Sequence, residues 1–336
     1  MRFPVGLELE LLAPAGKTRF DLARALAKQA GGALRLSFKY HGQGVLPDGR
    51  PDCHLTPAAR VLVRGKWFAS VVDDPTIVDD LARTPEFMRA ARTDDVRLAA
   101  WIERSCPGHF RPLQKTFAAT EDEAGFVDPW GQPLVRWHQV SAERARVCEV
   151  VLRPLGQKEL APTLRRVMKL ATSLGFTVPA EAAVHAHFDA APFRSTASLR
   201  RLVLAWSKER AVYLSRLKPN PRCRKLGPFP PDVVRVATEA TDELPFETLA
   251  AGLLLAGLHR AVDLNLLGLV ERFPKQPTIE VRCLPGSLDP EATLQALSDA
   301  SAFLESVREL DAPDAVRRTI RHVQRARGQK DRVRGV

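Results

Sequence analysis

The chain has 336 residues, of which 45% are hydrophobic and 26% are charged. That balance is ordinary for a folded protein, and the chain is long enough for one large core or two small ones. No apolar run reaches the roughly 20 residues that a membrane-spanning helix needs. The first ten residues, MRFPVGLELE, carry charge where a signal peptide requires apolar residues. These features predict a cytoplasmic protein with no membrane association.

Positive charge dominates, with 50 Lys and Arg residues against 39 Asp and Glu and a formal net charge of +11. Such an excess is compatible with a polyanionic partner, but arginine is spread along the whole chain rather than gathered in one patch. The densest run, Val316–Val336, reads as a helix that frays into a solvated end. We predict a basic C-terminal helix or tail at residues 313–336. Nucleic acid is not the expected partner, although the net charge leaves that alternative open.

The cysteines are odd in number, widely spaced and without a CxxC pair. This distribution favours free thiols over a disulfide framework or a thiolate zinc site. The five positions are Cys53, Cys106, Cys148, Cys223 and Cys283.

Hydrophobic periodicity predicts strands and helices along the whole chain. In the N-terminal half they are a strand at residues 2–12, a helix at 18–29, strands at 33–39, 60–64 and 67–72, a helix at 94–103, and loops with short strands at 106–139. In the C-terminal half they are strands at 146–152, 184–192 and 277–284 and helices at 160–174, 195–217, 232–241, 246–260 and 290–309. The strand at 146–152 is expected to stop at Arg153-Pro154. Strands that recur singly between helices favour an α+β fold around a largely antiparallel sheet, with no clear domain boundary.

The segment VHAHFD, at residues 184–189, has an unusual polar side. In a strand, alternate residues point to the same face. His185, His187 and Asp189 would therefore form one polar row, with Val184, Ala186 and Phe188 on the opposite face.

Three other predicted strands also place charged residues among apolar neighbours, and burying such groups is costly unless they are paired or bind a metal. Each strand alone is most simply a half-solvated face. Together they suit one shared concave sheet face, with oxygen ligands for Mg²⁺ or Mn²⁺ and a guanidinium for a phosphoryl group. The residues concerned are Glu8, Glu10, Glu149, Glu280 and Arg282.

A zinc hydrolase that uses His185, His187 and Asp189 is an alternative, since imidazole and carboxylate both bind zinc. That interpretation leaves the glutamates and Arg282 without a role. The chain has neither a GxxxxGK[ST] loop nor a GxGxxG turn, so a nucleotide would be held through metals rather than by a glycine-rich loop. The basic loop Pro219–Lys225, with Arg222, Arg224 and Lys225, is equally compatible with phosphate contact and with simple solvation.

The order of these segments resembles the amidoligase family of the carboxylate–amine ligase superfamily, which includes glutamine synthetase and glutamate–cysteine ligase. The segments are GLELE, CEVVLRP, VHAHFD, RAVDLNLL and TIEVRCLPGSLDPE, and they span nearly the whole chain. The resemblance implies a single catalytic domain at residues 1–312, built on an antiparallel, funnel-shaped sheet packed by helices. It also implies ATP and two or three divalent metals, Mg²⁺ or Mn²⁺, at the mouth of the sheet.

The resemblance also implies roles for individual residues. Arg282 matches the arginine that meets the transferring phosphoryl group, and His187 matches the histidine that faces the phosphates or the carboxylate. Arg260 and Asn265 match a pair at a helix end that contacts phosphate or acyl substrate. The implied metal ligands are Glu8, Glu10, Glu149, His185 and Glu280.

The expected activity is ATP-dependent amide formation through an acyl phosphate, with small-molecule or peptide carboxylates and amines as substrates. Asp189 and Glu149 are candidates to bind or deprotonate the incoming ammonium. Two segments depart from the family pattern: EVVLRP, where a serine turn is usual, and the loosely matching Asp73–Thr76. Both lie on the side of the pocket expected to select the substrate. The alternative from a different class is a decayed ligase fold that binds a polyanion or another partner.

Overall fold

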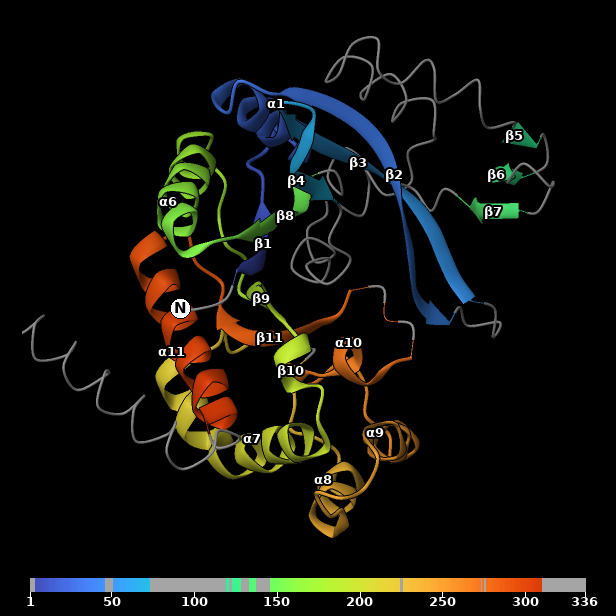
Figure 1. Ribbon diagram of the computed structural model, residues 1–336. Coiled ribbons are helices and arrows are strands. Elements are labelled where there is room, and N and C mark those ends of the chain that lie inside the picture. Colours follow the sequence, from blue (N-terminus) through green and yellow to red (C-terminus); the bar gives the residue numbers. More distant parts are fainter. Residues whose placement is uncertain are drawn as a thin grey trace, which may run out of the picture.

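The structure is a computed structural model that describes residues 4–45, 51–72, 119–120, 123–127, 133–136, 146–223, 226–272, 274 and 276–309. Its main feature is an eight-stranded sheet in the order β10-β11-β9-β1-β8-β4-β3-β2, in which every neighbouring pair is antiparallel (Figure 1). The strands are β1 (Val5–Leu12), β2 (Ala33–Val45), β3 (Pro51–Val63), β4 (Lys66–Val72), β8 (Val147–Leu155), β9 (Ala183–Asp189), β10 (Leu264–Asn265) and β11 (Thr278–Pro285).

The predicted α+β class and the largely antiparallel sheet are confirmed. The sheet is neither closed nor strongly curled, so the funnel shape implied by the resemblance is not found in the described strands. A second sheet of three short strands lies in the segment expected to hold loops and short strands. These strands are β5 (Ala119–Thr120), β6 (Glu123–Val127) and β7 (Pro133–Arg136).

Helices cover one face of the main sheet, where α1 contacts β3 and β4, α6 contacts β8, and α7 and α11 contact β11 (Figure 1). These four helices are α1 (Arg19–Gln29), α6 (Gln157–Ser173), α7 (Thr196–Leu217) and α11 (Pro290–Glu309). The remaining helical segments are η3 (Ala191–Phe193), α8 (Pro231–Glu239), α9 (Phe246–Leu255) and α10 (Leu267–Val270). No helix in the described part of the chain is long and apolar enough to cross a membrane.

Strand β1 separates the core from the polar face. It lies between β8 and β9, and its alternate residues Val5, Leu7, Leu9 and Leu11 are all buried in the hydrophobic core. Because side chains alternate across a strand, the intervening glutamates lie on the opposite face of the sheet. The helices therefore pack on the apolar side and leave the carboxylates on the other side.

Most predicted boundaries agree with the structure because local signals specify them. At α1, the Thr18 side chain and the Asp21 carboxylate form a capping box, with Asp21 accepting from the Thr18 backbone N–H at 2.9 Å. Helix α9 ends at Leu255 rather than at the expected Arg260, and Gly257 follows with a φ of +91°. A positive φ of this kind favours glycine and ends the helix.

The predicted end of the strand at 146–152 is wrong, because β8 continues through Pro154 to Leu155. The pairing of β1 with β8 is irregular here: Leu7 faces Leu152, whereas Val5 faces Leu155. This bulge accommodates a proline, which cannot donate a ladder hydrogen bond. The expected helix at residues 94–103 and the basic tail at 313–336 lie outside the described residues. The single catalytic domain at residues 1–312 stays a prediction.

Candidate metal centre

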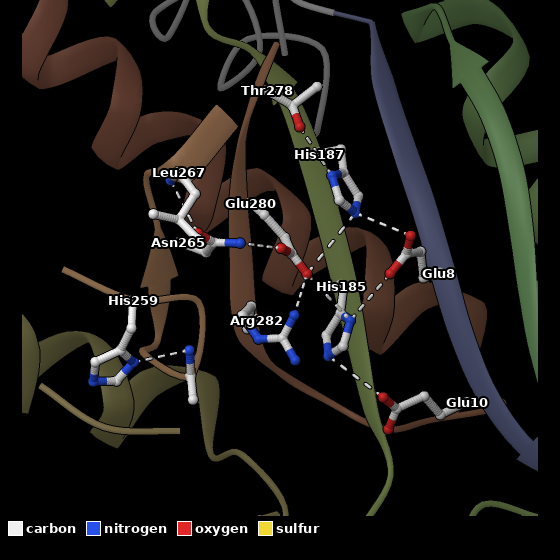
Figure 2. A network of polar contacts seen from close by, with 11 residues as sticks. Glu8, Glu10, His185, His187, His259, Asn265, Leu267, Thr278, Glu280 and Arg282 are labelled. Atoms are coloured by element: carbon white, nitrogen blue, oxygen red, sulfur yellow. Dashed lines mark hydrogen bonds and ion pairs between the residues drawn. The ribbon is translucent and has the colours of Figure 1, made fainter. Parts of the chain in front are cut away.

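Residues on β1, β9 and β11 meet on the polar face of the sheet (Figure 2). Glu8 on β1 lies opposite His185 on β9, and Glu280 on β11 lies opposite His187 on β9. Directly opposed residues of an antiparallel pair share a face, with Cβ atoms about 4.5–5.5 Å apart. The strand order therefore brings together segments that are far apart in the sequence.

His185 lies at the centre of the group and contacts three carboxylates. Its Nδ1 lies 3.2 Å from Glu8 Oε2 and 3.4 Å from Glu280 Oε1, and its Nε2 lies 3.4 Å from Glu10 Oε1. Its exposed fraction is only 5%. The imidazole thus has carboxylate oxygens next to both ring nitrogens in a site with little access to water.

His187 is placed between the same group and a hydroxyl. Its Nε2 lies 3.3 Å from Glu8 Oε1 and 3.9 Å from Glu280 Oε1. Its Nδ1 lies 3.1 Å from Thr278 Oγ1, across the β9–β11 pair. Contacts at both nitrogens fix the plane of the ring.

Glu280 is held by two further side chains. Asn265, from the two-residue strand β10, donates from Nδ2 to Glu280 Oε2 at 2.6 Å, while its Oδ1 accepts the backbone N–H of Leu267 at 3.0 Å. Arg282 donates from a terminal guanidinium nitrogen to Glu280 Oε1. Both carboxylate oxygens of Glu280 are therefore oriented by neighbouring groups.

Glu10 is the carboxylate that contacts the Nε2 side of His185. It is 5% exposed, and its Oε2 accepts the backbone N–H of Ala183 at 2.6 Å. Glu149 lies directly opposite Glu10 in the β1–β8 pair and is half-buried. A side-chain contact with Glu149 also acts to lower the pKa of Glu8. All five residues expected to bind metals are thus on one face, across four neighbouring strands.

The carboxylates and imidazoles at the centre shift each other's pKa values in opposite directions. Burial acts to raise the pKa of Glu8, but hydrogen bonds with His185 and His187 hold that pKa well below its ordinary value of 4.5. For His185, burial and the nearby Arg282 act to lower the pKa, yet Glu8, Glu10 and Glu280 raise it above 6.5.

Glu8, His185 and Glu280 form a group that could hold a metal ion, since one ligand atom from each lies within 4.8 Å of the others. The donors are two carboxylates and one imidazole, a set that suits Mg²⁺ or Mn²⁺. Four carboxylates share this face with one guanidinium, so a divalent cation would balance part of their charge. The buried Nε of Arg282 has no hydrogen-bond partner among the described residues. The residues present therefore fit a metal that brings an anionic ligand.

Other predicted site residues are more exposed than this group. Asp189 is exposed, and its Oδ1 accepts the backbone N–H of Ala191 at the start of η3. Arg260 and Arg222 are exposed, whereas His185 and Glu280 of the cluster are buried. Residues 224 and 225, the expected Arg224 and Lys225 phosphate contacts, lie outside the described residues.

Sequence reasoning missed one member of the group and one contact. Thr278, which orients His187, lies two residues before Glu280 on β11. The two-residue alternation could have identified it, but a threonine in a strand is too common to stand out. Asn265 was expected to contact phosphate or substrate, whereas its side chain in the structure bonds Glu280.

Comparison with known families places this chain in a family. The family described as "Putative amidoligase enzyme" matches residues 2–304. The match covers most of the chain, and the chain belongs to this family of amide bond-forming ligases. Comparisons with curated proteins and with solved structures find no match.

Proposed function

We propose that the protein is an ATP-dependent carboxylate–amine ligase that works through an acyl phosphate and uses Mg²⁺ or Mn²⁺. Family membership supports amide bond formation in general. The observation that carries the finer proposal is the Glu8, His185 and Glu280 group, with the Arg282 guanidinium against it. A hard-cation site beside a half-buried arginine is suited to a polyphosphate.

Bound divalent metal would neutralise charge on the β- and γ-phosphates and favour attack at phosphorus. Glu8, His185 and Glu280 would hold it, with Glu10 and Glu149 available for a further ion. A substrate carboxylate oxygen bonds to the γ-phosphorus while the bond to ADP breaks, which gives an acyl phosphate. An amine nitrogen then bonds to the acyl carbon, inorganic phosphate leaves, and the ammonium proton passes to a base.

The protein's own side chains would position these groups. Arg282 is already oriented by Glu280, and its guanidinium would bind phosphoryl oxygens. His187, held by Thr278, presents its other nitrogen to the same group of carboxylates and would steady the phosphoryl oxygens. Asp189 and Glu149 remain candidates for the base that accepts the ammonium proton.

The test is calorimetric titration of ATP with and without Mg²⁺, on the wild type, on Glu280→Ala and on the control Glu291→Gln. Glu291 is an exposed carboxylate on α11 that pairs with Arg165 at 2.7 Å and is not part of the cluster. We expect Mg²⁺-dependent ATP binding by the wild type and the control, and its loss in Glu280→Ala with the fold retained. Unchanged binding by Glu280→Ala would refute the metal assignment.

The same titration separates the alternatives. A folded wild type that binds no Mg·ATP but retains nucleic acid in a salt-dependent way would favour the decayed ligase fold. Tightly held stoichiometric zinc after purification would favour the hydrolase. The geometry gives the hydrolase less support, since the Asp189 carboxylate bonds the backbone of η3.

A further inference from the structure

One row of directly opposed residues leads from the metal centre across the sheet toward its open edge. Strand pairing places Glu8 opposite Val151, Val151 opposite Ser70, and Ser70 opposite Arg60. Arg60 in turn lies opposite Arg35 on the edge strand β2. No register shift falls at any of these pairs. All five residues therefore share the face that carries the cluster.

Exposure increases along this row. Glu8 is mostly covered, Val151 and Ser70 are half-buried, and Arg60 and Arg35 are exposed. Beside Ser70, the exposed Trp67 donates from its indole nitrogen to Ser70 Oγ at 3.0 Å, and 39% of Trp67 is exposed. An exposed tryptophan that is held by a hydrogen bond offers an apolar surface to a ligand. The row thus crosses two half-buried residues, passes an exposed tryptophan and ends at two exposed arginines.

The two arginines lie directly opposite each other on neighbouring strands. Like charges directly opposite each other on neighbouring strands destabilise a sheet. In the part of the chain that the structure describes, no hydrogen bond or ion pair is found for either guanidinium. A ligand with a carboxylate would relieve this repulsion and accept hydrogen bonds from both side chains.

We propose that Arg35 and Arg60 bind a second carboxylate of the acyl substrate, and that this substrate is an extended acidic peptide. This inference rests on the proposed function, because Glu8 marks the end of the row at which the reacting carboxylate would lie. Three strand spacings separate Glu8 from Arg60, which is about 14 Å between Cα atoms at about 4.8 Å per spacing. An extended peptide covers that span in about four residues at 3.3–3.6 Å each. A free acidic amino acid is too short to reach both ends.

The test uses fluorescently labelled acetyl-Glu-Ala-Ala-Ala-Glu-amide, whose two glutamates lie four positions apart on one face of an extended chain. Two comparison peptides carry Gln in place of one Glu, or have the glutamates adjacent. The double variant Arg35→Gln/Arg60→Gln removes the cationic pair. The control Arg166→Gln/Lys169→Gln removes two exposed charges from α6, which packs on the other face of the sheet.

By fluorescence anisotropy, we expect the double variant to bind the long diacidic peptide about tenfold more weakly than the wild type, as for loss of a charge-assisted hydrogen bond. The control should bind it as tightly as the wild type, and both comparison peptides should bind the wild type weakly. Unchanged affinity in the double variant would overturn the proposal. An equal loss in the control would overturn it too, because net charge alone would then explain binding.

The peptide titration is made with and without Mg·ATP, so that a failure of the arginine subsite can be distinguished from a failure of the proposed function. If the double variant binds the long diacidic peptide as tightly as the wild type does while Mg·ATP binding is intact, the arginine subsite is refuted and the ligase proposal stands. Absence of Mg·ATP binding refutes the proposed function, while the peptide titration without nucleotide still reports on the arginines. Mg·ATP binding by Arg35→Gln/Arg60→Gln should match that of the wild type, since both residues lie away from the cluster.

Discussion

Replacing Asn265 with alanine should weaken metal binding without unfolding the protein. Asn265 touches the metal centre only through Glu280, to which its Nδ2 donates at 2.6 Å, while its Oδ1 accepts the Leu267 N–H (Figure 2). It is therefore a positioning residue. Without this side chain, the Glu280 carboxylate can rotate, and its oxygens can turn away from Glu8 and His185.

The magnitude follows from the two lost hydrogen bonds. A hydrogen bond to a charged group contributes about 1.5–3 kcal/mol and a neutral one about 1 kcal/mol. Stability without metal should therefore fall by about 2.5–4 kcal/mol. Loss of a residue that orients a metal ligand typically lowers metal affinity by about 10–100-fold.

The assay is Mn²⁺ titration followed by calorimetry, together with urea unfolding in the absence of metal. The matched control is Thr196→Val, which removes a buried hydrogen bond of 2.5 Å to the Leu244 carbonyl, away from the cluster. Both variants should lose stability, but only Asn265→Ala should lose Mn²⁺ affinity. If Asn265→Ala bound Mn²⁺ as tightly as the control did, the assigned role of Asn265 would be refuted.

Three further outcomes are expected. Mn²⁺ at 100 times its Kd should stabilise the wild type by about 2.7 kcal/mol in thermal unfolding, with no effect on Glu280→Ala. Gly268→Ala should lower urea stability by about 3 kcal/mol or more, because its Cβ would meet two backbone oxygens at 2.4 Å; Gly156→Ala, with its closest contact at 4.0 Å, is the control. Arg210→Ala should lower stability by about 3–5 kcal/mol at pH 7, because the fully buried Asp263 loses its partner. Burial already raises the pKa of Asp263, so this deficit should shrink as pH falls toward 4 in urea titrations, and a constant deficit would refute the explanation.

The polar faces of individual strands could be predicted from the sequence because the strand period is two. Glu8 with Glu10, His185 with His187, and Glu280 with Arg282 each follow that alternation, and the structure places all six on one face. Helix starts were equally accessible, since Thr18 and Ser195 are capping residues in the sequence and in the structure.

Contacts between strands could not be predicted in the same way, because they depend on strand order. The bond from Asn265 to Glu280 requires the two-residue strand β10 to pair with β11, and two residues are too few to give a periodic signal. The row from Glu8 to Arg60 depends on three successive registers, each between segments far apart in the chain. Alternation along a strand predicts the face of the sheet on which a residue lies, but not which residue lies beside it on the next strand.

The alternation along β1 specifies the fold and the candidate site together. A register slip of one residue would move Glu8 and Glu10 into the apolar core and Leu7 and Leu9 onto the polar face. Burying an unpaired carboxylate costs several kcal/mol, so the slipped register is strongly disfavoured. Burial of the leucines therefore determines which face of β1 packs on the core, and this places the glutamates on the opposite face. The crowded carboxylates add little stability of their own without a cation, which is the pattern expected where a protein gives up some stability for a binding site.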